Sequence, residues 1–160
     1  MKISISVRDR KIQEFLNEFQ NESPRAAAIL GGAYLDYLLK ALLKSRLVTD
    51  RSLFKELDRL TFERTMNLCY LTGVINKADR DDLKKINWIR NKFAHDIKLN
   101  TFMRSDISSK CNNLEIVNLM QKDEPIVEKP RDKYTLAIAF FATTLKKIIR
   151  ECQRIETLGI

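Results

Sequence analysis

Glycine and proline are scarce in this 160-residue chain, which contains four glycines and three prolines. Average usage of the two together is about 12% of residues, so the turns that most β-sandwiches need are missing. Hydrophobic residues make up 44% and charged residues 31%, a composition that excludes a largely disordered chain. The chain is long enough to bury a core of its own, and we expect a single domain over 1–160.

Patterns of metal ligands are also missing from the sequence. The three cysteines, Cys69, Cys111 and Cys152, are widely spaced and form no CxxC pair, which argues against a zinc ribbon or a thioredoxin-like site. We expect them to be reduced, buried thiols of a reducing compartment. His95 is the only histidine. We therefore expect no metal and no cofactor.

No hydrophobic run approaches the roughly 18 apolar residues that cross a bilayer. The first ten residues, MKISISVRDR, contain no apolar segment typical of a signal peptide. We therefore expect a cytoplasmic protein with no membrane partner. The net charge is +8, which attracts polyanions such as nucleic acids, although such an excess can also serve solubility alone.

Hydrophobic periodicity predicts an all-α fold, a bundle of four to five main helices. Ser23 followed by Pro24 is typical of a helix start, and the helix that begins there is apolar around much of its surface. Its Gly31 and Gly32 weaken helix formation and predict close approach of another helix. One helix is predicted to begin near residue 8. Further helices are predicted over 23–47, 61–72, 76–94, 106–113 and 132–158.

Two segments show a different pattern. Residues 2–7 alternate between apolar and polar and predict a short strand in an N-terminal arm over 1–7. A strand needs a partner, which residues 114–119 or a second subunit could supply. We expect residues 114–132 to form a loop insertion.

The last predicted helix has apolar residues at alternating spacings of four and three. Such a row packs against another helix, either within the chain or in a second subunit. Its members are Tyr134, Ile138, Phe141, Leu145, Ile148, Cys152 and Ile155.

The segment 90–95, RNKFAH, ends the helix predicted over 76–94 and holds the residues best suited to chemistry. A histidine can move a proton near neutral pH, and a guanidinium can stabilise charge on a phosphoryl group. These are the parts of a metal-free RNA cleavage in which a 2′-hydroxyl attacks its own phosphate. Asn91 could orient His95 or contact a phosphate. Arg90 and His95 can meet only if the helix frays or if two chains bring their motifs together.

A structural interpretation of the same residues is also open. His95 can interact with the last carbonyl groups of its helix. Arg90 lies at the edge of the core face and can pair with a carboxylate of the central helix, such as Asp36.

The chain resembles the MltR family, named for the mannitol operon repressor, and the broader HEPN class of small helical domains. The resemblance spans about a third of the chain. It rests on FERTMNLCYLTGVI at 62–75, DLKKI at 82–86, IRNKFAH at 89–95, TF at 101–102 and DISSKC at 106–111.

The two parts of this resemblance imply different functions. The MltR family implies a non-catalytic transcriptional regulator of a sugar (mannitol) uptake operon that binds protein or nucleic acid. The HEPN class implies a metal-independent endoribonuclease, often a toxin or defence effector, although members without nuclease activity also exist. Its signature of an arginine, a polar residue and a spaced histidine matches Arg90, Asn91 and His95. That class pairs two motifs across a homodimer and implies RNA as a partner. An inhibitory antitoxin or a transcription-factor partner is a further expectation.

Basic residues near the motif and on the last helix are expected to contact nucleic acid, with a solvated helix face as the alternative. They are Lys84, Lys85, Lys92, Lys98, Lys147, Arg150 and Arg154. Trp88 and Tyr70 could stack on bases, although a place in the core or an interface is the commoner role for each.

Three aspartates, Asp79, Asp81 and Asp82, begin the helix that carries the motif. They suit the positive end of the helix dipole. Two of them could alternatively bind Mg²⁺. The helices 61–72 and 76–94 also fit a helix-turn-helix, but these aspartates would then face DNA phosphates of like charge, so we do not favour that interpretation.

Overall fold

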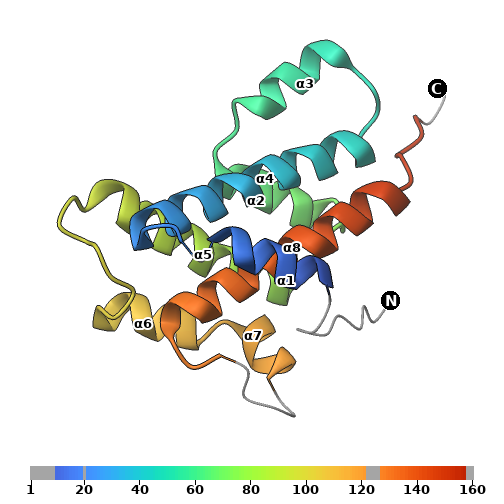
Figure 1. Cartoon of the computed structure of the whole chain (residues 1–160). Helices are drawn as coiled ribbons and strands as arrows, with labels where there is room; N and C mark the ends of the chain where they lie inside the picture. The colour runs from blue at the N-terminus through green and yellow to red at the C-terminus, as the bar shows by residue number, and fades with distance from the viewer. Residues whose placement is uncertain (1–9, 20, 122–126, 158–160) are drawn as a thin grey trace.

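The computed structural model describes residues 10–19, 21–121 and 127–157, and over these residues the protein is an all-α bundle, as predicted. Figure 1 shows the helices gathered around α2 and α8, with α3 at the upper edge and α6 and α7 at the lower one. The helices are α1 (Arg10–Phe19), α2 (Pro24–Arg46), α3 (Arg51–Asp58), α4 (Phe62–Leu71), α5 (Lys77–His95), α6 (Ser105–Asn112), α7 (Glu115–Met120) and α8 (Pro130–Glu151).

Helix α2 is the centre of the bundle and packs against α8, α5 and α4. It begins as predicted, with the Ser23 hydroxyl accepting a 3.1 Å hydrogen bond from the Ala26 N–H and with Pro24 at its first position. Its length and mean hydropathy of 1.4 would suit a membrane span, but half of the apolar window is buried inside the protein. The burial is that of a core helix.

Gly31 and Gly32 allow two helices to approach α2 closely, as predicted. A Cβ atom on Gly31 would lie 3.2 Å from Cγ1 of Ile138 in α8. A Cβ atom on Gly32 would lie 2.6 Å from Cγ of Arg90 in α5. The missing side chain of Gly32 therefore makes room for the stem of Arg90.

The start of α5 is also as predicted. Asn76 Oδ1 accepts a 2.9 Å hydrogen bond from the Asp79 N–H, and Asp79 Oδ2 accepts one of 3.4 Å from the Asn76 N–H. This reciprocal cap satisfies two backbone donors that the first turn of a helix leaves free. Before it, Gly73 turns the chain with φ of 71°, a conformation that glycine adopts without strain.

Residues 114–119, one of the two partners considered for a strand at 2–7, do not form a strand, because they lie at and within helix α7 (Glu115–Met120). The loop insertion expected over 114–132 therefore contains a helix. Two of the first backbone N–H groups of α7 are bound by a distant carboxylate, that of Asp82 in α5, at 3.0 Å from Glu115 and 2.8 Å from Ile116. The strand and arm expected over 1–7 lie outside the described residues.

Helix α8 ends at Glu151, earlier than the predicted residue 158. The chain instead turns along the end of α2, where the Ile155 N–H donates a 2.8 Å hydrogen bond to the Arg46 carbonyl. Arg46 returns a bond of 2.7 Å to the Gln153 carbonyl. Ile155 therefore does not belong to the helical seam, whose first members, from Tyr134 to Leu145, are buried.

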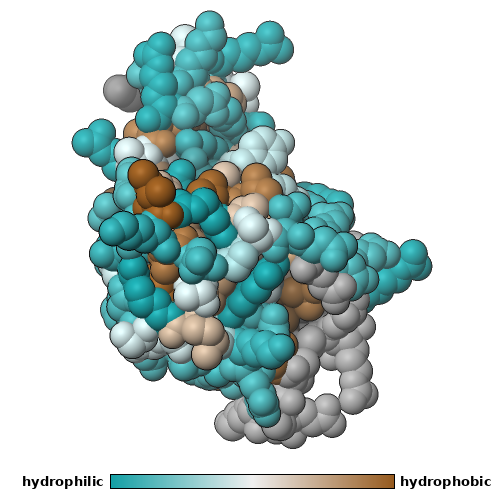
Figure 2. Space-filling model, turned by 60° about the vertical axis from the view of Figure 1, so that its left-hand side comes forward, coloured by the Kyte–Doolittle hydropathy of each residue, from teal (hydrophilic) through white to brown (hydrophobic). Residues whose placement is uncertain are grey.

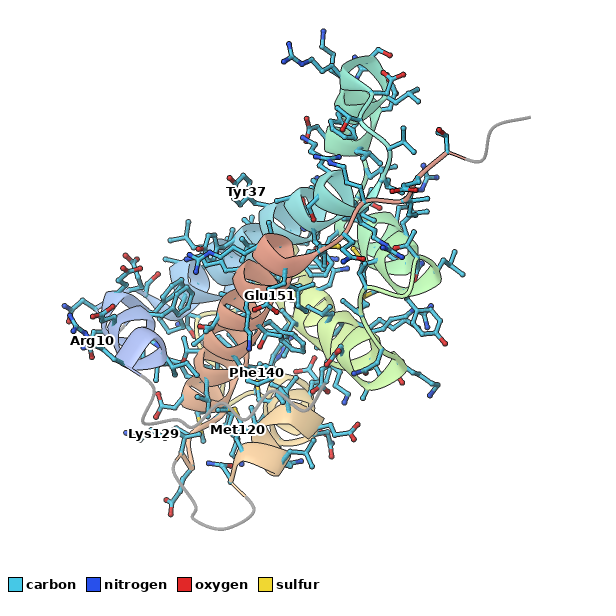
Figure 3. The ribbon with its side chains drawn as sticks, turned by 90° about the vertical axis from the view of Figure 1, so that its right-hand side faces the viewer. Arg10, Tyr37, Met120, Lys129, Phe140 and Glu151 are labelled. Atoms are coloured by element: carbon cyan, nitrogen blue, oxygen red, sulfur yellow. The ribbon has the colours of Figure 1, made fainter. Side chains whose placement is uncertain are left out.

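Helix α3 (Arg51–Asp58) was not predicted. Asp50 begins it by accepting hydrogen bonds from the backbone N–H groups of Ser52 and Leu53. The helix has no buried residues, and in Figure 1 it projects from the bundle. Figure 3 shows Tyr37 of α2 also pointing outwards, and its side chain is 65% exposed.

Candidate functional site

Helix α5 continues without a break through His95, and its C-cap is Asp96. Because Arg90 and His95 are five positions apart, they project about 140° from each other around the helix axis. The helix does not fray in the way that would let the two side chains meet. One chain therefore presents the guanidinium and the imidazole on different sides of the same helix.

Arg90 is half-buried where α5 meets α2. Its Nη1 donates a 2.7 Å hydrogen bond to Oδ1 of Asn91, and its Nε is buried with no hydrogen-bond partner among the described residues. The stem of the side chain lies against Gly32. The sequence left open that Asn91 would orient His95. In the structure it orients the guanidinium of Arg90.

No described carboxylate lies within 4 Å of the Arg90 guanidinium, and the structural alternative of a pair with Asp36 is wrong. Asp36 pairs with Lys40 at 2.8 Å, one turn along α2. Its other oxygen, Oδ1, is buried without a partner in the described part of the chain, and so is Oδ1 of Asn87, one turn before Arg90. One charged donor, in Arg90, and two acceptors, in Asp36 and Asn87, are therefore buried without a hydrogen-bond partner among the described residues.

His95 is exposed, and no hydrogen bond joins its side chain to a described residue. Arg25, from the first turn of α2, binds one of the last carbonyl groups of α5, which His95 could have capped, and three carbonyl groups of the chain that follows the helix. Its guanidinium donates to the carbonyl oxygen of Phe93 and, at 2.8, 2.8 and 2.9 Å, to those of Asp96, Ile97 and Leu99. Arg25 thus holds the turn that carries the imidazole.

A second arginine holds the chain that follows His95. Arg104 donates to Oδ2 of Asp96 at 2.6 Å and to both carboxylate oxygens of Asp106 at 2.7 and 3.0 Å. These bonds hold the pKa of each carboxyl below its usual range. Beneath them, the ring of Phe102 lies 4.7 Å from that of Phe93, centroid to centroid. The chain on both sides of His95 is therefore held by packed, buried rings and by the ion pairs of Arg104.

The basic residues that the sequence predicted to contact nucleic acid have different surroundings. Lys84, Lys98, Lys147 and Arg150 are exposed. Lys85 is not available, because its ammonium bonds to Asp82 at 2.8 Å and to the Asn113 carbonyl at 2.6 Å.

The predicted stripe along the last helix does not form. Arg154 lies beyond α8 and donates to the carbonyl groups of Lys44 and Leu47 at 3.0 and 2.9 Å. It ties the end of the chain to α2, so only Lys147 and Arg150 remain on the exposed side of the helix.

Lys92 belongs to a cluster that the sequence showed only in part. Its ammonium lies 5.1 Å from the centroid of the Trp88 ring, and that of Lys110, in α6, lies 4.7 Å from the same ring. Lys110 was missed because it lies on another helix, and nothing in its local sequence indicates that the fold brings it to Trp88. Tyr70 has a similar neighbour in Arg80, at 5.2 Å.

The three aspartates at the start of α5 all have internal roles. Asp79 caps the helix, and its pKa is raised, chiefly by burial. Asp81 pairs with Lys77 at 3.1 Å, and Asp82 binds α7. Among the described residues, no three His, Cys, Asp or Glu side chains are placed to hold a metal ion.

The three cysteines are free, and two of them are buried, Cys69 and Cys111. Burial raises the pKa of each of these two thiols to about 12, so neither is a nucleophile at neutral pH. Cys152 is half-buried after the end of α8.

Figure 2 shows a mainly hydrophilic surface on one side of the molecule, with small groups of apolar residues below the projecting helix at the top.

Comparisons of this chain with protein-family models, with curated proteins and with solved structures find no match. What the protein does must therefore be inferred from the residues of the site itself.

Proposed function

We propose that this protein is an MltR/HEPN-like regulator that acts on RNA as a metal-independent endoribonuclease of the toxin or defence type. Arg90 would stabilise charge that develops on the phosphate, Asn91 would orient the guanidinium, and His95 would transfer the proton. We place it in the cytoplasm, where an inhibitory antitoxin or a transcription-factor partner would hold it in check.

The observation that carries this proposal is the half-buried guanidinium of Arg90, which has no carboxylate beside it among the described residues. A half-buried guanidinium normally has a carboxylate beside it, because an unpaired charge is unfavourable away from water. The hydrogen-bond partner of the Arg90 guanidinium among the described residues is the neutral amide of Asn91, and no described carboxylate lies within 4 Å of it. An anionic group such as an RNA phosphate would supply the missing charge.

The proposal requires a homodimer. Arg90 and His95 project to different sides of α5, so one chain alone does not bring both groups to the same phosphate. Two copies related by a two-fold axis would place the arginine of one chain beside the histidine of the other. Each dimer would then hold two composite sites.

The first test is cleavage of mixed cellular RNA by the purified chain in excess EDTA. We expect cleavage that His95→Ala and Arg90→Ala each abolish, with circular dichroism unchanged, and that Arg51→Ala, an exposed arginine of α3, leaves intact. Growth arrest on expression of the chain alone, relieved by His95→Ala, would support a toxin. Cleavage that persists in both variants would overturn the proposal.

Mixing the two inactive variants tests whether the site is composite. A mixed dimer of Arg90→Ala and His95→Ala chains has one site with both groups intact and one with neither. Random re-pairing should therefore restore about a quarter of the wild-type activity. No recovery, in a mixture shown by mass spectrometry of differently tagged chains to contain mixed dimers, would contradict the composite site.

A second candidate function is a non-catalytic MltR-type repressor of a sugar (mannitol) uptake operon, acting by protein or nucleic-acid binding. The unbroken helix favours it, because a single chain holds Arg90 and His95 apart. It predicts a chain that cleaves no RNA and arrests no growth. A monomer at micromolar concentration in light scattering would favour it further.

A further inference from the structure

Trp88 joins the ammonium groups of two lysines from different helices. Lys92 follows it by one turn on α5, and Lys110 comes from α6. Both ammonium groups lie within 5.1 Å of the ring centroid. Attraction to the electron-rich face of an indole holds each cation in place, and it is strongest for tryptophan among the aromatic residues.

The positive charge of this cluster is not neutralised within the described protein. Neither Lys92 nor Lys110 has a described carboxylate within 4 Å, although both are half-buried. The acidic residue near Lys92 is Asp106, and Arg104 binds both of its carboxylate oxygens. Two like charges are therefore gathered at one ring without an ion pair to a described carboxylate, an arrangement that favours binding of an anion.

The cluster and His95 share one side of α5. Trp88 and His95 are seven residues apart, which places them within about 20° around the helix axis and about 10 Å along it. Lys84, exposed, lies one turn before Trp88 on the same side. A chain of nucleotides bound at Trp88 would thus run along the helix towards the imidazole.

We propose that Trp88, Lys92 and Lys110 form a binding site for single-stranded RNA, in which the two ammonium groups bind phosphates and the indole stacks on a base. An indole with two lysines beside it offers the two interactions by which proteins bind single strands, stacking and phosphate contacts, once the ammonium groups move from the ring to the phosphates. The site deepens the proposed function and rests on it, since it would lead the substrate to the site that contains His95.

The only tryptophan of the chain reports directly on this binding. The probe is a 12-nucleotide 2′-O-methyl RNA without self-complementarity, which lacks the 2′-hydroxyl and so cannot be cleaved. We expect it to quench the fluorescence of Trp88. The same strand in a duplex, whose bases are already stacked, should quench little. Base-free polyphosphate should bind through the lysines with little quenching.

The lysines are tested by anisotropy of the labelled probe. Lys92→Ala with Lys110→Ala should weaken binding about tenfold or more and reduce the salt dependence of log K by about 0.7 for each phosphate that the variant no longer binds. Trp88→Leu should weaken binding by about tenfold. The matched control is Lys146→Ala, because Lys146 of α8 also lies over a ring, that of Tyr34 at 5.4 Å, with no second lysine. It should change the affinity less than twofold.

The outcomes separate this site from the nuclease proposal. Binding of the probe without a change in Trp88 fluorescence, or equal losses in Lys146→Ala and the double variant, would overturn the site. Quenching by polyphosphate as strong as that by RNA would overturn base stacking. A chain that cleaves no RNA but binds the probe at Trp88 would refute the nuclease and retain the site. A chain whose cleavage depends on His95 but not on Trp88, Lys92 and Lys110 would support the nuclease and refute the RNA-binding site.

Discussion

Arg25, in the first turn of α2, donates a 2.9 Å hydrogen bond to the carbonyl oxygen of Leu99, 74 residues later in the chain. Its bond to Phe93 satisfies a carbonyl group that the end of α5 would otherwise leave free, and its bonds to Asp96 and Ile97 hold the chain that follows. It therefore connects the central helix to the turn that carries His95.

Replacing Arg25 should loosen that turn. Arg25→Ala should lower the free energy of unfolding by about 2–3 kcal/mol, because it leaves several half-buried carbonyl groups without a donor. It should also shift the single histidine signal in NMR spectra. Arg131→Ala is the matched control, since Arg131 binds the carbonyl groups of Phe19 and Glu22 instead. It should destabilise the protein but leave the signal of His95 in place, and equal shifts in both variants would contradict a specific role for Arg25.

The buried carboxylate of Asp82 should be the most important of the three aspartates for stability. Asp82→Ala removes the partner of two backbone N–H groups of α7 and of Lys85, and it should cost about 2–3 kcal/mol in urea unfolding. Asp81→Ala, which removes an exposed pair with Lys77, should cost less than about 1 kcal/mol. Similar losses in the two variants would argue against the distant cap.

The two glycines of α2 should respond differently to alanine. Gly32→Ala places a Cβ atom 2.6 Å from Cγ and 2.9 Å from Cβ of Arg90, atoms too near the backbone to move freely. We expect a loss of about 1–3 kcal/mol from overpacking, and a loss of RNA cleavage as Arg90 is displaced. Gly31→Ala meets only side-chain atoms of Ile138, from 3.2 Å, and regains helix propensity. Its unfolding free energy should stay close to that of the wild type.

Acid should weaken the segment after His95. Hydrogen bonds from Arg104 lower the pKa of Asp96 and Asp106 below the usual 3.8. Their contribution to stability is therefore present above that pH and is lost as the pH falls through the lowered values. In urea titrations from about pH 5 down to about pH 2, Arg104→Gln should show a smaller fall in stability than the wild type. Arg59→Ala, which removes an exposed pair with Glu56, should leave the slope unchanged.

Three of the helix starts that could be predicted have local caps. Ser23, Thr61 and Asn76 each lie within three residues of the N–H group that they bind, so the sequence itself carries the signal. Helix α7 could not be predicted, because its cap, Asp82, lies 33 residues away. The sequence offered residues 114–119 only as a possible strand partner or as part of a loop, whereas a tertiary contact stabilises a helix there.

The residues of the candidate site also fall into those that the sequence indicates and those that only the fold brings there. Arg90, Asn91 and His95 could be chosen from residue type and spacing, and their different directions follow from the helical period. Arg25 and Lys110 could not, since each acts on α5 from another helix. Arg154 was misplaced because the end of α8 depends on contacts of the following chain with α2, which helical periodicity does not contain.

The segment after α8 also determines how the chain can be shortened. Through Gln153, Arg154 and Ile155 it covers the last turn of α2, the helix that packs against α4, α5 and α8. A protein truncated at Glu151 would leave that turn open to water. The amide protons of that turn would exchange faster with solvent, and proteases would gain a point of entry near Arg46. Screening for shorter, better crystallising versions of the protein should therefore leave this tail in place.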